Sequence, residues 1–233
     1  MTLKSLSIAL STTALIGLAL PVMAQDKTGT NVNTEAAASP AGGAETLGLA
    51  SQLYAMGVAS GDALTVLTAA KLAMGVEVKE GGDIKKTTTG DMPADDAEGA
   101  ADAPVDAMMM LAKAKELAAD DEILMGLIAD AEAEGSRGRI GGAVSWLSRL
   151  PSGQTDVWEI PFYGNSYAEI AVVGDGDANL DVAITDENGN VFCYDVSWSD
   201  SLYCNFTPSW DGYFYVTVQN MGRARNSYYL MTN

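Results

Sequence analysis

The spacing of apolar residues changes once along this chain, from a helical period to a period of two. From Val157 onward, apolar and polar residues alternate in short runs separated by Gly, Asp, Asn and Ser. The runs are Val157–Tyr163, Ser166–Val173, Leu180–Ile184, Val191–Tyr194, Leu202–Phe206, Tyr213–Val218 and Tyr228–Met231. Asn188-Gly189, between two of them, is a strong hairpin signal. Seven short strands at this spacing predict an antiparallel β-sandwich over residues 155–233.

The upstream part has the pattern of paired helices. One hairpin is expected over residues 44–79, because Gly61 suits the end of a first helix and Asp62 caps a second. Another is expected over residues 104–135, with Pro104 in the first turn. The pairs resemble tetratricopeptide-like repeats, although they lack the 34-residue period of that family. Their narrow apolar stripes must pack on each other or on the sandwich to be stable.

Aromatic residues divide the chain into the same two parts. Of 17 Phe, Trp and Tyr residues, only Tyr54 and Trp146 precede residue 155, whereas Ala and Met concentrate upstream. The fold class is therefore α + β in separate domains. We expect a signal peptide (1–24), a flexible leader (25–43), the first hairpin (44–79), a disordered acidic linker (80–103), the second hairpin (104–135), a Gly/Arg hinge (136–154) and the sandwich (155–233).

The N-terminus has the order of a secretory signal peptide. Lys4 precedes an apolar run from Leu6 to Val22, and small residues lead to a predicted cut after Ala24. The run is interrupted by polar residues and Pro21, and it is shorter than the roughly 20 apolar residues of a spanning helix. We therefore expect a periplasmic or extracellular protein that does not insert in a membrane after cleavage.

The charge and the missing histidine exclude several function classes. The chain has 13 basic and 31 acidic residues; loss of Lys4 with the signal peptide leaves 12 basic residues and a net charge of −19. Such a charge repels nucleic acids and anionic lipid surfaces. Without His, the His-based triads and the usual zinc sites are impossible. No other constellation indicates catalysis, so we predict that the protein is not an enzyme.

Two cysteines indicate one disulfide. Cys193 and Cys204 lie on neighbouring predicted strands, and an even count in an exported chain favours a Cys193–Cys204 bond over reactive thiols. The bond would clamp the polar loop between them, which contains Trp198.

Several motifs are similar to the bacterial pre-peptidase C-terminal domain. They are the segments 174–182 (GDGDANLDV), 186–189 (DENG), 206–213 (FTPSWDGY) and 218–230, which ends in NSYYL. The resemblance covers residues 155–233 and implies a non-catalytic, jelly-roll-like sandwich appended to secreted proteins, often proteases. Such modules are associated with secretion or with binding of substrates and surfaces. No protease domain precedes the module in this sequence.

One acidic segment has the spacing of a calcium loop. Oxygen-bearing side chains occur at positions 1, 3, 5, 7 and 12, the pattern that Ca²⁺ prefers: Asp175, Asp177, Asn179, Asp181 and Asp186. Leu180 occupies position 6, where the EF-hand turn needs Gly. The alternative is a solvated turn stabilised by Asp and Gly. Calcium is the one cofactor that the sequence suggests.

Exposed aromatic side chains are the other candidates for binding. A set of aromatic residues in the sandwich could stack on sugar rings: Trp158, Tyr163, Tyr167, Trp198, Trp210, Tyr213, Tyr215 and Tyr228. Most of them lie in predicted strands, and we expect most of them in the core of so small a module. Trp198 lies in a polar loop, so we predict that it is exposed and contacts a ligand. Met108-Met109-Met110 is either an adaptable binding surface or the interior of a helix pair.

These observations lead to one functional hypothesis with an alternative. The sandwich of a non-catalytic exported protein binds a protein, a polysaccharide or another surface of the cell envelope. Alternatively, the chain is an accessory module that assists the secretion or maturation of a separately encoded enzyme.

Overall fold

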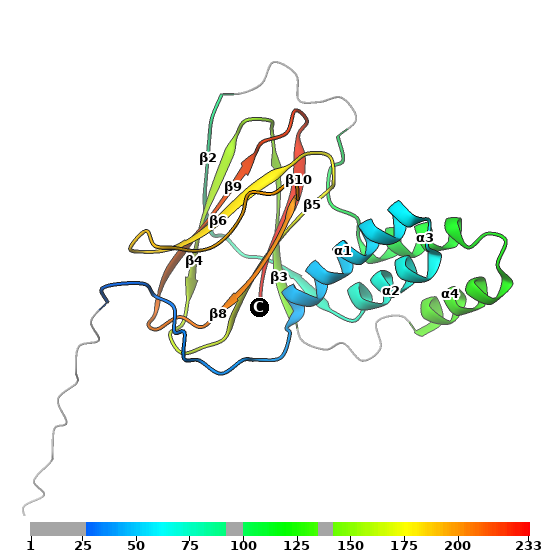
Figure 1. The fold of residues 1–233 in the computed structure, drawn as a ribbon, viewed down its shortest axis with the longest axis horizontal. Coiled ribbons are helices and arrows are strands. Elements are labelled where there is room, and N and C mark those ends of the chain that lie inside the picture. The colour runs from blue at the N-terminus through cyan, green and yellow to red at the C-terminus, as the bar shows by residue number, and fades with distance from the viewer. Residues whose placement is uncertain (1–26, 92–99, 135–141) are drawn as a thin grey trace, which may run out of the picture.

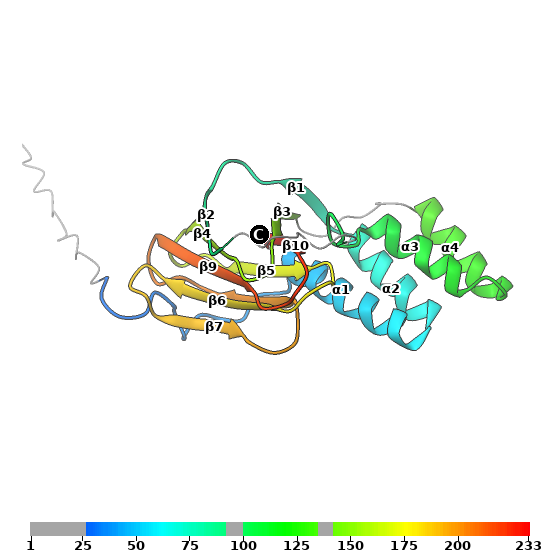
Figure 2. The same ribbon diagram turned by 90° about the horizontal axis from the view of Figure 1, so that it is seen from above.

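The computed structural model describes residues 27–91, 100–134 and 142–233, which form four helices and ten strands. The strands build a β-sandwich, and the helices form a unit that extends from one side of it (Figures 1 and 2). The predicted signal peptide lies outside the described residues. Within the described ranges, no helix has the length and apolar character needed to cross a membrane.

Each layer of the sandwich is a five-stranded sheet. Sheet A has the order β1 (Glu77–Glu80), β3 (Gly142–Leu150), β10 (Asn226–Thr232), β5 (Ala168–Gly174) and β8 (Ser201–Phe206). Sheet B has the order β2 (Lys85–Thr89), β4 (Thr155–Phe162), β9 (Gly212–Asn220), β6 (Leu180–Asp186) and β7 (Val191–Asp195). All pairs are antiparallel except β1–β3. The seven strands predicted from the alternation are confirmed as β4 to β10.

The alternation buries one face of each strand between the sheets. Ile170, Ile184, Phe214, Val216 and Leu230 are among the core residues from both layers. β5 is buried along its whole length, because α1 covers the outer face of sheet A at this strand. Its nearly continuous apolar sequence is what burial on both faces requires.

The helices share one small-residue core. α1 (Gly43–Ser60) and α2 (Ala63–Met74) form the first hairpin, and α3 (Ala107–Leu117) and α4 (Glu122–Glu134) form the second. Gly61 adopts φ 66° at the end of α1, and Asp62 caps α2, as the sequence predicted. α3 begins at Ala107, later than expected from Pro104, because Asp106 provides its cap. The two hairpins pack together through this core. The structure does not show the expected resemblance to tetratricopeptide-like repeats.

The boundaries of the sandwich differ from those expected. Residues 85–89, placed in a disordered linker, form edge strand β2, whose five residues are all exposed and therefore polar. Residues 142–150, placed in a hinge, form β3, which pairs with β10 and contains Trp146. The second hairpin is thus inserted between strands of the sandwich. Residues 92–99 of the expected linker and residues 136–141 of the expected hinge lie outside the described residues.

The segment expected to be a flexible leader lies along the sandwich from residue 27 to residue 42. Its anchor is Asn31, which is completely buried. The Asn31 side chain donates to the Trp210 carbonyl at 3.1 Å and accepts from the Trp210 N–H at 3.0 Å. The Asn31 N–H donates to Asp186 Oδ2 at 2.8 Å. The composition of the segment did not indicate that it is ordered, because its order depends on hydrogen bonds between Asn31 and residues more than 150 positions away in the sequence.

Candidate binding surfaces

The disulfide joins the two sheets at one side of the sandwich. Cys193 lies on β7, the edge of sheet B, and Cys204 lies on β8, the edge of sheet A, with 6.4 Å between their Cα atoms. The predicted Cys193–Cys204 bond is confirmed. It closes the β7–β8 connection and also fixes the spacing of the layers where both sheets end.

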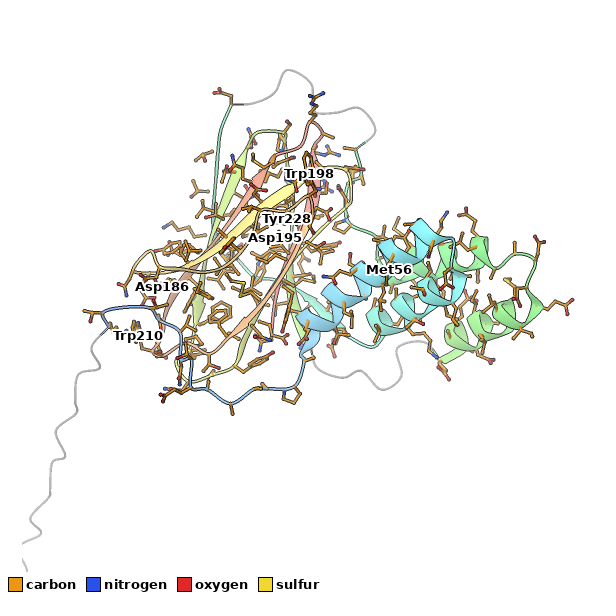
Figure 3. All side chains as sticks on the ribbon, in the orientation of Figure 1. Met56, Asp186, Asp195, Trp198, Trp210 and Tyr228 are labelled. Atoms are coloured by element: carbon orange, nitrogen blue, oxygen red, sulfur yellow. A yellow bond between two sulfur atoms is a disulfide. The ribbon has the colours of Figure 1, made fainter. Side chains whose placement is uncertain are left out.

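The connection between the cysteines presents Trp198 to solvent. Trp198 is 96 % exposed, as the sequence predicted, and Tyr194 and Val196 beside it are each 66 % exposed (Figure 3). Short turns hold the loop: the Ser197 N–H donates to Asp195 Oδ1 at 2.7 Å. Exposed apolar side chains therefore occur at the end of β7 and on the ordered loop after it, and we call them the Trp198 patch (Tyr194, Val196 and Trp198).

The five side chains of the predicted calcium loop do not form one site. Asp186 ends β6, whereas Asp175, Asp177 and Asn179 precede its first residue. A seven-residue strand separates its ends by about 20 Å, too far for a shared ion. In the described ranges, no three acidic, His or Cys side chains converge on a metal-sized site. The five-residue calcium set is therefore wrong, because β6 extends where an EF-hand loop would turn back.

The first carboxylates of this segment stabilise loops instead. Asp175 accepts from the Asp177 N–H at 3.0 Å and from the Ser227 N–H at 2.7 Å, and Asp177 accepts from the Ala101 N–H at 2.7 Å. Burial raises the pKa of Asp175, and the negative Asp177 and Asp200 raise it further, against the lowering effect of these N–H groups. Among the remaining members, Asn179 donates to Asp181 at 3.3 Å. The alternative of a turn stabilised by Asp fits this geometry.

Asp186 holds the N-terminal segment, residues 27–33, against the sandwich by a hydrogen bond. It is fully buried, and it accepts hydrogen bonds from the Asn31 N–H and from the backbone and side chain of Asn190. Burial raises the pKa of Asp186, but the hydrogen bonds from Asn190, Asn31 and Asn188 outweigh burial and hold the pKa below its ordinary value. The carboxylate therefore stays ionised and joins the β6–β7 turn to residues 27–33.

A second cluster of polar groups lies inside the sandwich. Asp156 is completely buried and accepts from Tyr228 OH at 2.7 Å and Ser148 Oγ at 2.6 Å, while Trp158 Nε1 donates to Tyr228 OH at 2.7 Å. Burial, followed by the negative charge of Asp156, raises the pKa of Tyr228 well above its ordinary value. Both side chains are enclosed between the sheets, so this network stabilises the core.

Sheet B exposes tyrosines on its outer face. Along β9, Phe214 and Val216 point into the core, so Tyr213 and Tyr215 point outward. Tyr213 pairs with Pro161 of β4, and Tyr163 follows just beyond the end of that strand. Tyr163 is 77 % exposed and Tyr213 is 52 % exposed. We call these three residues (Tyr163, Tyr213 and Tyr215) the tyrosine face.

A groove of about 510 Å³ adjoins the tyrosine face. Tyr163 and Tyr213 line it together with the carboxylates Glu187 and Asp211 and the Lys27 side chain. Asp211 Oδ1 accepts from the Gly164 N–H at 2.7 Å, which fixes this carboxylate at the groove. Glu187 accepts from Trp210 Nε1 at 2.5 Å, below the groove floor.

Sequence reasoning included these tyrosines among the residues that could stack on sugar rings, but it did not separate them from the core, where it expected most aromatic residues. That assignment is confirmed for Trp158, Trp210 and Tyr228 and is wrong for Tyr163 and Tyr213. The run 213–218 (YFYVTV) contained the missing signal. Its Phe and Val residues occupy alternate positions and fill the core-facing side of the strand, so the Tyr residues between them must face outward.

Comparisons with known proteins found similar proteins only among solved structures. No family model and no curated protein match the chain. A solved structure similar to it is the pre-peptidase C-terminal domain of a collagenase from Bacillus anthracis, at 18 % identity over 38 % of this chain and 87 % of that chain, with a TM-score of 0.33.

Two carbohydrate-binding modules also match. The C-terminal CBM6 of LamC, from Zobellia galactanivorans, has 11 % identity over 38 % of this chain and 90 % of that one, with a TM-score of 0.25. A family 35 carbohydrate-binding module from Clostridium thermocellum has 19 % identity over 39 % and 90 %, with a TM-score of 0.22. The pre-peptidase C-terminal family, which the sequence motifs resemble, is therefore among the similar structures. We infer no ligand from these similarities.

Proposed function

We propose that this protein is a non-catalytic binding protein of the periplasm or the cell exterior, and that sheet B binds a neutral polysaccharide. The observation that carries the proposal is the pair of exposed tyrosines, Tyr163 and Tyr213, beside a groove with fixed carboxylates. The disulfide and the predicted signal peptide support the location.

The tyrosine face suits sugar rings for a geometric reason. Tyr213 and Tyr215 stand two residues apart on one strand, about 7 Å, and offer flat apolar surfaces that end in hydroxyl groups. Asp211 and Glu187 at the groove supply acceptors for sugar hydroxyls. Stacking surfaces with a few fixed polar groups are typical of sites that orient a polyhydroxylated ligand.

The charge of the molecule favours a neutral polymer over an anionic one. The chain has a net charge of −18, and two of the three charged side chains that line the groove are acidic. An anionic polysaccharide would be repelled both by the whole molecule and by the groove.

The experiment is a binding assay with a panel of insoluble neutral glucans and peptidoglycan. We expect the purified protein to bind at least one neutral glucan, and Tyr163→Ala/Tyr213→Ala to weaken that binding by ~10-fold or more, since the loss of 1.4 kcal/mol is tenfold. Trp198→Ala is the matched control, because Trp198 is an exposed aromatic residue away from the groove. Unchanged binding by the double variant would refute the assignment of the site.

The Trp198 patch supports a second candidate function, that of an accessory module for a separately encoded protein. Three exposed apolar side chains close in sequence, one on β7 and two on the ordered loop after it, form the kind of anchor that protein interfaces use. On this proposal, Trp198→Ala abolishes co-purification of a stoichiometric envelope protein, and the tyrosine variants leave it intact. Retention of the partner by Trp198→Ala would exclude this surface.

A further inference from the structure

An apolar cavity of about 560 Å³ lies where the helical unit meets sheet A. Its floor is the outer face of sheet A, where Tyr229 pairs with Val173 and Met231 lies two residues along β10. Leu47 of α1 and Leu111 of α3 are among the residues of the helical wall. The cavity is separate from the tyrosine face, which belongs to the other sheet.

The size of this cavity exceeds that of packing defects. Protein interiors leave few voids larger than a water molecule, which occupies roughly 30 Å³ of liquid. Pockets for small molecules range over about 300–1,000 Å³ and are mostly apolar. Its walls are long, flexible side chains that could have filled the space, including four methionines: Met74, Met108, Met110 and Met231. Methionine thioethers adapt to irregular apolar ligands.

Two carboxylates line the cavity, and Lys115 forms an ion pair with one of them, Glu132. Among the described residues that line it, the charged side chains are Asp106 and Glu132. Asp106 Oδ1 accepts from the Met109 N–H at 2.8 Å, so the carboxylate is fixed at the start of α3. Together with the acidic charge of the whole chain, the Asp106 carboxylate attracts a cation and repels an anionic head group.

We propose that this cavity binds the alkyl chain of an amphiphile that carries a cationic head group. The chain lies against Val173 and Met231 of the floor, and the head group lies near Asp106. The helical unit then has a role of its own, because it closes one wall of a site that sheet A alone leaves open to solvent. This inference does not depend on the proposed polysaccharide site.

The methionines make the test direct. The protein is labelled with ¹³C at the methionine methyl groups and titrated with dodecyltrimethylammonium below its micelle concentration. Chemical shifts of Met74, Met108, Met110 and Met231 should move with a saturable curve. Met56 and Met125, which are exposed residues of α1 and α4 and do not line the cavity, serve as internal controls (Met56 is labelled in Figure 3). No shift at the lining methionines, or equal shifts at the controls, would overturn the proposal.

Two further arms test the cavity and the charge. Ala107→Trp places an indole in the cavity, whereas Ala112→Trp makes the same change on the exposed side of α3. We expect the first to weaken binding by ~10-fold or more and the second to leave it unchanged. Laurate should bind ~10-fold more weakly than the ammonium probe, and equal affinity would overturn the cationic assignment. If Ala107→Trp does not fold, the methionine spectra of the unmodified protein still decide.

Discussion

The carboxylate of Glu169 joins the sandwich to the helices, and its replacement tests how these parts are held together. Glu169 is a completely buried residue of β5. Its Oε1 atom accepts from the Gly42 N–H at 2.6 Å, and Oε2 accepts from the Ala44 N–H at 3.2 Å. Gly42 itself provides no cap for α1. A strand of the sandwich therefore supplies the negative charge and the acceptors that the first turn of α1 needs.

The hydrogen bonds set the expected magnitude. Two charge-assisted bonds of about 1.5–3 kcal/mol each predict that Glu169→Ala weakens the attachment of α1 by about 4 kcal/mol. Glu169→Gln keeps one acceptor but loses the charge, so we expect about 2 kcal/mol. A total stability of roughly 5–15 kcal/mol makes either loss large. Glu45→Gln is the control, because Glu45 is only partly buried and its Oε2 bonds to Tyr203 OH alone at 2.9 Å.

Two optical signals separate the parts in urea. The helices lie before residue 135, so circular dichroism at 222 nm follows them; all four Trp residues lie at or after residue 146, so their fluorescence follows the sandwich. With a slope near 2 kcal/mol per molar urea, Glu169→Ala should move the helix transition down by about 2 M. The tryptophan transition should move less. A helix midpoint that is the same in Glu169→Ala and in Glu45→Gln would refute this role.

Three further outcomes concern the sandwich. The pKa of Asp186 is lower in the folded protein than in the unfolded chain. The ionised carboxylate therefore stabilises the fold fully above about pH 4, and this stabilisation is lost as the pH falls further. Residues 27–33 should then become sensitive to an acid protease. Asn31→Ala leaves the Trp210 N–H and carbonyl without these bonds and should cost about 3 kcal/mol, measured by urea unfolding against Asn33→Ala. Cys193 and Cys204 are 11 residues apart in the sequence. Reduction of their disulfide should lower the free energy of unfolding by about 3 kcal/mol and lower the melting temperature, and an unchanged Tm would contradict this.

Local patterns were sufficient for the four helices and for seven of the ten strands of the described residues. The period-two alternation located β4 to β10, and the Gly61-Asp62 pair placed the turn between α1 and α2, because both signals depend on neighbours within a few residues. The exposure of Trp198 and the disulfide also followed from the sequence, since a polar loop between two strands leaves an aromatic residue little to pack against. The acidic charge and the missing histidine excluded whole classes of function.

Contacts between distant residues decided the remainder. β2 is polar in sequence and is a strand only because β4 offers it an edge, and the leader is ordered only because Asp186 and Trp210 meet Asn31. The spacing of the predicted calcium ligands did not indicate that β6 is an extended strand, which places Asp186 at the opposite end of β6 from Asp175, Asp177 and Asn179. The tyrosine face and the apolar cavity likewise form from strands and helices far apart in the chain. Sequence therefore determined most of the local elements and the disulfide of this protein, whereas only the tertiary structure decided which polar groups are buried together and where surfaces for ligands arise, because these depend on contacts between distant residues.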